Sequence, residues 1–155
     1  YAALAEKLEA AAKRSKNYGY MFESYAALAR VLAVKYDLGY LTREAYEKGD
    51  KNALAALLPD YEKTLENLEN FVAVYEKQWM KENKPHGFDV QDIRLGGIIR
   101  RTKSCTRRLR AYLNGELEKI EELEEATVDV TTGGEPQKNG ACCNHYNTIA
   151  TANIL

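Results

Sequence analysis

Six apolar residues recur at alternating steps of four and three positions, and this spacing restricts the fold more than any other feature of the chain. They are Tyr61, Leu65, Leu68, Val72, Tyr75 and Trp79. An α-helix completes a turn about every 3.6 residues, so these side chains form one stripe that a neighbouring helix must cover. Pro59 and Pro85 flank the stripe and predict the two ends of this helix.

Similar stripes predict further long helices on either side. One helix before Gly39 carries a second apolar stripe: Met21, Tyr25, Leu28, Leu32 and Tyr36. The opening residues, 1–13, are also predicted to be helical. Another helix begins at Asp89, where the spacing to Asp92 resembles a capping box. This helix either breaks at Asn114 and Gly115 or continues to Glu125.

Two short helices are predicted between the long ones. Thr42 is expected to cap the first, which ends near Lys48, and Asp50 is expected to cap the second, which Pro59 ends. We therefore predict an all-α fold in which residues 1–125 form a bundle of long antiparallel helices. Because most tyrosines lie on the apolar stripes, we expect core packing for Tyr25, Tyr36, Tyr61 and Tyr75.

The last 30 residues differ in character from the rest, since residues 126–155 lack helical periodicity. Residues 127–132 are rich in Thr and Val and favour extended backbone, and a Gly-Gly pair follows them. The prediction for this segment is an irregular, partly extended C-terminal tail. We expect the tail to pack on the bundle or on a part of the protein outside this sequence.

Composition places the chain in a class rather than assigning a function. Its 155 residues are 45% hydrophobic and 29% charged, which is typical of a soluble globular domain. The sequence begins at Tyr1 inside a predicted helix and without a signal segment, so we expect a fragment of a larger protein. A net charge of −1 favours neither nucleic acid nor a membrane surface as a partner. The odd number of cysteines, three, favours reduced thiols and a cytoplasmic location.

Two clusters offer binding chemistry, but each has a simpler interpretation. Cys142, Cys143 and His145 form one compressed group without the second ligand pair of a typical zinc site, so neither a metal nor another cofactor is predicted. Six cations between residues 100 and 110 could follow a phosphate backbone. An acidic run follows them at residues 116–125, so a solvated helix with opposite charges at its two ends is the better explanation.

The densest group of polar side chains lies in the predicted turn at residues 82–88 and the helix start that follows. The candidates for contact with a substrate are Trp79, Glu82, His86, Asp92 and Arg94. Gly96 and Gly97 fall inside the predicted helix, where each costs about 1 kcal/mol relative to alanine. Such a cost predicts close approach of a helix, another domain or a second subunit. A plain interhelical turn beside an interface is the alternative to direct contact with a ligand.

Residues 79–97, WMKENKPHGFDVQDIRLGG, resemble the C-terminal helical region of bacterial family 20 glycoside hydrolases. Residues 100–125 and the final TANIL resemble the same region, whereas the first 75 residues do so only in general character. The resemblance implies an exo-acting β-N-acetylhexosaminidase, which removes terminal N-acetylglucosamine or N-acetylgalactosamine with a TIM-barrel catalytic domain. An adjacent Asp-Glu pair performs catalysis in that family, and this sequence contains no such pair. No catalytic residue is therefore expected in this chain.

The resemblance implies two roles for the domain. It packs against its own TIM barrel, directly or through the tail, and completes a homodimer. Alternatively, residues 82–94 reach the glycan substrate in an active site, its own or a partner subunit's, where Glu82 or Arg94 binds sugar hydroxyls. Periodicity and composition alone leave a third reading open, a free-standing helical interaction module with no enzyme attached.

Overall fold

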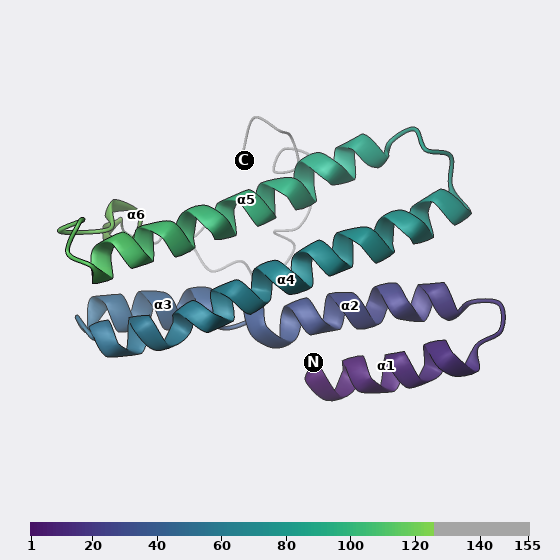
Figure 1. Ribbon diagram of the computed structural model, residues 1–155, viewed down its shortest axis with the longest axis horizontal. Helices are drawn as coiled ribbons and strands as arrows, with labels where there is room; N and C mark the ends of the chain where they lie inside the picture. Colours follow the sequence, from purple (N-terminus) through teal and green to yellow (C-terminus); the bar gives the residue numbers. More distant parts are fainter. Residues whose placement is uncertain (126–155) are drawn as a thin grey trace, which may run out of the picture.

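The computed structural model describes residues 1–125, which form helices joined by turns. The helices are α1 (Ala2–Arg14), α2 (Gly19–Lys35), α3 (Leu38–Glu47), α4 (Lys51–Glu82), α5 (Phe88–Leu113) and α6 (Glu121–Glu124). Neighbouring long helices run in opposite directions (Figure 1), so the prediction of an all-α bundle of long antiparallel helices is confirmed. The predictions for the tail at residues 126–155 lie outside the described residues. Among the described helices, none combines the length and apolarity that crossing a bilayer requires.

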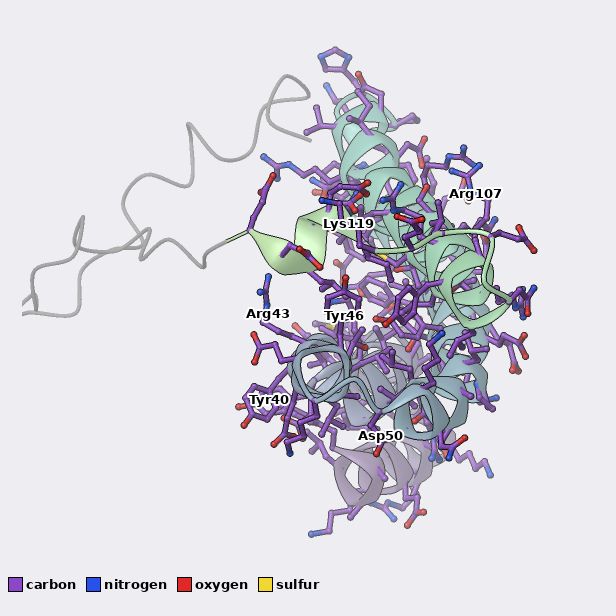
Figure 2. The ribbon with its side chains drawn as sticks, turned by 90° about the vertical axis from the view of Figure 1, so that its left-hand side faces the viewer. Tyr40, Arg43, Tyr46, Asp50, Arg107 and Lys119 are labelled. Atoms are coloured by element: carbon purple, nitrogen blue, oxygen red, sulfur yellow. The ribbon has the colours of Figure 1, made fainter. Side chains whose placement is uncertain are left out.

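Four helices lie side by side in the order α1, α2, α4, α5, and we call this arrangement the helical layer (Figure 1). Helix α4 is its centre, because α4 contacts α2, α5 and also α3. In the view along the helices, α3 and α6 lie together on one side of α4 and α5 (Figure 2). The two faces of the helical layer are therefore unequal, and only one of them carries these short helices.

The predicted stripe of α4 is confirmed, since its residues are buried or half-buried. Tyr61 and Leu68 are buried against the neighbouring helices, and Leu54, one helical segment earlier, is fully buried. The main core cluster joins α3, α4, α5 and the segment before α6 through these residues: Leu38, Ala45, Leu54, Tyr61, Leu109 and Ile120.

The prediction that Pro59 ends a helix is wrong, because α4 continues through it to Glu82. A proline inside a helix leaves the carbonyl four residues earlier without its usual donor. Here Pro59 and Ala55 are both exposed, so water can reach the unpaired carbonyl. Burial of Leu54 and Tyr61 on the opposite side holds the helix together across this position. The predicted cap is confirmed, since the Asp50 carboxylate accepts a hydrogen bond of 2.9 Å from the Ala53 amide.

The prediction that Thr42 begins a helix is also wrong. Helix α3 begins at Leu38 and includes Gly39, and Thr42 is buried in its interior. The Thr42 hydroxyl lies 2.7 Å from the Leu38 carbonyl and 2.8 Å from the Tyr61 hydroxyl. A threonine can satisfy its hydroxyl inside a helix in this way, so the residue type alone does not distinguish a cap from a core position.

Both ends of α5 are set by glycines. Gly87 precedes the helix with a φ of 97°, and no side chain caps it, so the predicted capping box at Asp89 is wrong. At the other end the helix breaks at Asn114 and Gly115, which was one of the two alternatives. Gly115 has a φ of 79°, and the Glu116 amide returns to the Ala111 carbonyl at 2.8 Å. This left-handed turn directs the chain back over α5 toward α6.

Helix α2 faces its neighbours with small side chains. Ser24, Ala26, Ala27, Ala29 and Val31 are buried. The predicted stripe lies on another side of the helix, where Tyr25 is 52% exposed and Tyr36 is 69% exposed. Core packing is therefore wrong for these two tyrosines, although it is confirmed for Tyr61. The reason is that α2 has a helix on each side, and small residues let both approach closely.

Candidate functional site

The turn between α4 and α5 is built on three aromatic rings. The ring of Trp79 lies 5.8 Å from that of Phe88, and both lie near Tyr75, at 6.2 Å and 6.1 Å. The Trp79 indole donates a hydrogen bond of 3.0 Å to the Lys84 carbonyl. Trp79 therefore stabilises the turn through this hydrogen bond and its contact with Phe88. Contact between Trp79 and a substrate stays a prediction.

Glu82 lies at the end of α4 beside the start of α2. Its carboxylate accepts a hydrogen bond of 2.9 Å from the Tyr20 hydroxyl and one of 3.2 Å from the Gln78 amide. The hydrogen bond to Glu82 raises the pKa of Tyr20, and the Lys81 ammonium lies 3.8 Å from the centre of the Tyr20 ring. These contacts tie the α4–α5 turn to α2. Glu82 itself is exposed.

The remaining candidates are spread along the turn and the first turns of α5. His86 and Asp92 are exposed, whereas Arg94 is half-buried and its Nε is buried without a hydrogen-bond partner. Among the hydrogen bonds and ion pairs between described residues, none joins two of the five predicted site residues. Within the described residues, the five candidates therefore lie toward one end of the helical layer but form no hydrogen bond or ion pair with one another.

The two adjacent glycines of α5 have different surroundings. Gly96 is exposed, and a Cβ placed there would meet nothing within 4 Å. Gly97 is half-buried and lines a groove. No contact between described residues explains a glycine at position 96, so close approach by another domain or subunit stays a prediction.

The groove beside Gly97 has a volume of about 450 Å³. Its floor is α4, and its walls are the α2–α3 junction and the middle of α5. The lining residues are Lys35, Leu38, Gly39, Tyr61, Thr64, Gly97, Ile98, Arg101, Thr102 and Cys105. Thr64 is completely buried, and its hydroxyl has no hydrogen-bond partner. The groove is therefore largely apolar, with two cations and one unsatisfied hydroxyl.

Large apolar side chains gather on one side of α1 and α2, and we call this surface the aromatic face. It consists of Tyr1, Leu4, Tyr25, Leu28, Leu32 and Tyr36, of which Leu32 alone is half-buried rather than exposed. The four residues from α2 and its end recur three or four positions apart and so share one stripe. The rings of Tyr1 and Tyr36 lie 5.5 Å apart, which joins α1 to this stripe.

The opposite side of α2 is polar. Arg30 forms a two-pronged ion pair with Glu9 of α1, at 2.9 Å and 3.1 Å. Glu23, seven residues earlier on the same stripe, lies 3.7 Å from Lys77 of α4. The α1–α2 pair is therefore amphipathic, because one side of α2 carries ion pairs and the other carries exposed aromatic rings. The periodicity of the sequence predicted this stripe, but as part of the core.

The basic and acidic runs contact each other and the neighbouring helix. Arg108 pairs with Glu121 and Glu122, Arg110 pairs with Glu62, and Lys103 lies 3.3 Å from Glu69. The prediction of one helix with opposite charges at its two ends is therefore wrong, because α5 ends at Leu113 and the acidic run folds back to pair with the basic run. Within the described residues, no three His, Cys, Asp or Glu side chains meet to hold a metal ion. Cys142, Cys143 and His145 lie outside those residues.

The sequence was compared with models of known protein families. The model of the Glycoside Hydrolase 20C C-terminal domain matches residues 1–142. The match covers all the described helices and extends beyond them. No curated protein matches the sequence.

Proposed function

We propose that this chain packs through its aromatic face against the catalytic domain of an exo-acting β-N-acetylhexosaminidase. The premise is that the chain belongs to the family of Glycoside Hydrolase 20C C-terminal domains. The chain is then the non-catalytic, helical part of the enzyme. Hydrolysis of terminal N-acetylglucosamine or N-acetylgalactosamine belongs to the catalytic domain. The absence of an Asp-Glu pair from the sequence agrees with this division.

The aromatic face is the observation that carries the proposal. Exposed aromatic rings gathered on one side of a domain usually mark an interaction surface. Tyr25 and Tyr36 lie more than half exposed on a helix that packs against α1 and α4 through small side chains. A partner that covers them gains about 1.5–3 kcal/mol for each large side chain fully removed from water. The polar side of the α1–α2 pair offers no comparable gain.

The test is the double variant Tyr25→Ser/Tyr36→Ser in the full-length enzyme. We expect it to lower the thermal stability of the enzyme and to increase cleavage by proteases between the catalytic domain and this one. Tyr18→Ser is the matched control, because Tyr18 is equally exposed but lies in the α1–α2 turn. If the double variant and the control have the same melting temperature and the same rate of cleavage, the catalytic domain does not cover the aromatic face.

The turn at residues 82–94 supports a second role, contact with the glycan at the mouth of an active site. The supporting observation is the half-buried Arg94, whose Nε has no hydrogen-bond partner. Arginine binds vicinal hydroxyls well because its guanidinium presents several donors in one plane. The active site in question belongs to the same chain or to the partner subunit of a homodimer.

Arg94→Ala in the full-length enzyme tests this second role. We expect a higher KM for a chromogenic N-acetylglucosaminide if the side chain binds the sugar. Arg107→Ala is the control, since Arg107 is exposed on the same helix and points away from α6 (Figure 2). Unchanged KM and kcat in the Arg94 variant would exclude contact between Arg94 and the substrate.

A further inference from the structure

The groove between the α2–α3 junction and α5 opens beside the point where the described chain ends. A second, smaller cavity shares Tyr61, Arg101 and Cys105 with the groove and is also lined by Ile120 and Leu123. The segment carrying α6 therefore borders the groove. Any chain that continues from α6 starts next to it.

Arg43 of α3 fixes the position of that segment. Its guanidinium donates to the carbonyls of Leu123 at 3.0 Å, Glu122 at 3.3 Å and Glu125 at 3.3 Å. Figure 2 shows Arg43 rising from α3 toward α6. The Tyr46 hydroxyl adds a contact of 3.0 Å with the Ile120 amide. These contacts hold the end of the described residues, at Glu125, on the side of the helical layer that carries α3 and α6.

We propose that residues 127–132 of this chain occupy the groove, with the side chains of Val128 and Val130 directed into it between the α2–α3 junction and α5. The segment reads Thr-Val-Asp-Val-Thr-Thr, and the two valines are separated by one residue. In extended backbone, alternate side chains point to the same side. Six extended residues span about 20 Å, which suits an elongated groove rather than a compact cavity.

The chemistry of the groove matches an extended peptide. Leu38, Ile98 and Cys105 offer apolar contacts to the valines. An extended segment also brings peptide N–H and C=O groups, which need partners when they are buried. Lys35 and Arg101 supply donors for the peptide carbonyls at the walls of the groove.

The family comparison agrees with an occupant from the same chain. The family match extends through residue 142, so residues 127–132 belong to the domain. This inference concerns the groove and does not depend on the proposed role of the aromatic face.

The reactivity of Cys105 tests the proposal, because this thiol lines the groove. Cys142 and Cys143 are first replaced by serine so that a maleimide reports on position 105 alone. In the whole 155-residue chain we expect slow labelling. Val128→Lys/Val130→Lys places two cations against Lys35 and Arg101, so the segment should leave the groove and labelling should accelerate by about tenfold or more.

The matched control is Thr127→Lys/Thr131→Lys, which adds the same charges to the same segment on the opposite side of an extended chain. We expect its labelling rate to equal that of the parent. Equal rates for the valine variant and the parent would overturn the proposal, and so would equal acceleration by both double variants. Rapid labelling of the isolated chain with protection only in the full-length enzyme would also overturn it, because the catalytic domain would then cover the groove.

Discussion

At the scale of single residues, the packing of α1 against α2 depends on Gly19. A Cβ at this position would lie 2.8 Å from the Ala12 carbonyl oxygen, closer than side chains tolerate. We expect Gly19→Ala to lower the free energy of unfolding by about 1–3 kcal/mol, because backbone must shift to relieve the contact. Denaturant unfolding of the isolated chain measures the change.

Gly96→Ala is the matched control for that substitution. It lies in the interior of α5, and its Cβ would meet nothing within 4 Å. We expect it to stabilise the isolated chain by up to about 1 kcal/mol, the usual difference between alanine and glycine in a helix. A loss of stability in the full-length enzyme alone would show that another domain or subunit approaches Gly96. Stabilisation in both proteins would contradict the close approach predicted from the sequence.

Tyr61 contributes a buried hydrogen bond. The Thr42 hydroxyl has one hydrogen, which it donates to the Leu38 carbonyl, so the Tyr61 hydroxyl must donate to Thr42. We expect Tyr61→Phe to destabilise the chain by about 1 kcal/mol, the usual net value of such a bond. Thermal unfolding of Tyr61→Phe beside Tyr18→Phe, an exposed control, measures it. An unchanged melting temperature would contradict a role for this bond in stability.

At the scale of helices, the pairing of α1 with α2 should depend on pH. The hydrogen bond from Arg30 lowers the pKa of Glu9 below its ordinary value of 4.5. A carboxyl group with a lowered pKa in the folded state stabilises that state above its unfolded pKa. This contribution is lost as the pH falls through the folded pKa.

Glu9→Gln tests the pair. We expect it to reduce stability modestly at neutral pH, because both side chains are partly exposed to water. The difference from the parent should disappear in acid, below the folded pKa of Glu9. Unfolding curves between neutral and acidic pH measure both effects. A difference that persists unchanged at low pH would mean that the substitution disturbs packing rather than charge.

Helix α4 carries a proline that weakens it locally. Pro59 is exposed within α4 and removes one backbone hydrogen bond. We expect Pro59→Ala to raise the free energy of unfolding, by up to about 3 kcal/mol, since alanine restores the bond and favours helix. Equilibrium unfolding in denaturant measures it, with Ala55→Ser as an exposed control on the same helix. A destabilised Pro59→Ala variant would show that contacts of the proline ring stabilise the fold more than the restored backbone hydrogen bond does.

These elements also show how far the sequence determines the fold. The stripe from Tyr61 to Trp79 predicted α4 correctly, because a helix with one strongly apolar side has one way to bury it. The predictions from Pro59 and Thr42 were wrong, because the local backbone preferences of these residues contribute less than burial of the core. Leu54 and Tyr61, which flank Pro59, are both buried. The sequence could not show which side of α2 is buried, because alanines bury little area but allow close helix packing. Periodicity alone gives no sign that the larger stripe is the exposed one.

The candidate site was predicted less well than the fold. The five predicted site residues do lie near one end of α4 and α5, as their positions in the sequence require. Their contacts depend on residues distant in the chain, such as Tyr20 for Glu82, and no local pattern contains that information. The groove is lined by residues of four helices, α2, α3, α4 and α5, so its residues show no motif in the sequence.

At the scale of the whole molecule, the aromatic face should make the isolated chain associate. Tyr1, Leu4, Tyr25, Leu28 and Tyr36 are all exposed on one side. We expect light scattering to show self-association that increases with concentration and that Tyr25→Ser/Tyr36→Ser reduces. Tyr18→Ser should have no effect. Monomeric behaviour of the parent chain at high concentration would contradict this expectation.

The most direct test of the central claim is hydroxyl-radical footprinting of Tyr25 and Tyr36 in two proteins, the isolated chain and the full-length enzyme. Tyr18 serves as an internal reference, because it is exposed outside the aromatic face. We predict strong labelling of Tyr25 and Tyr36 in the isolated chain and protection in the enzyme, with Tyr18 labelled in both. Equal labelling of Tyr25 and Tyr36 in the two proteins would contradict the claim that this face packs against the catalytic domain.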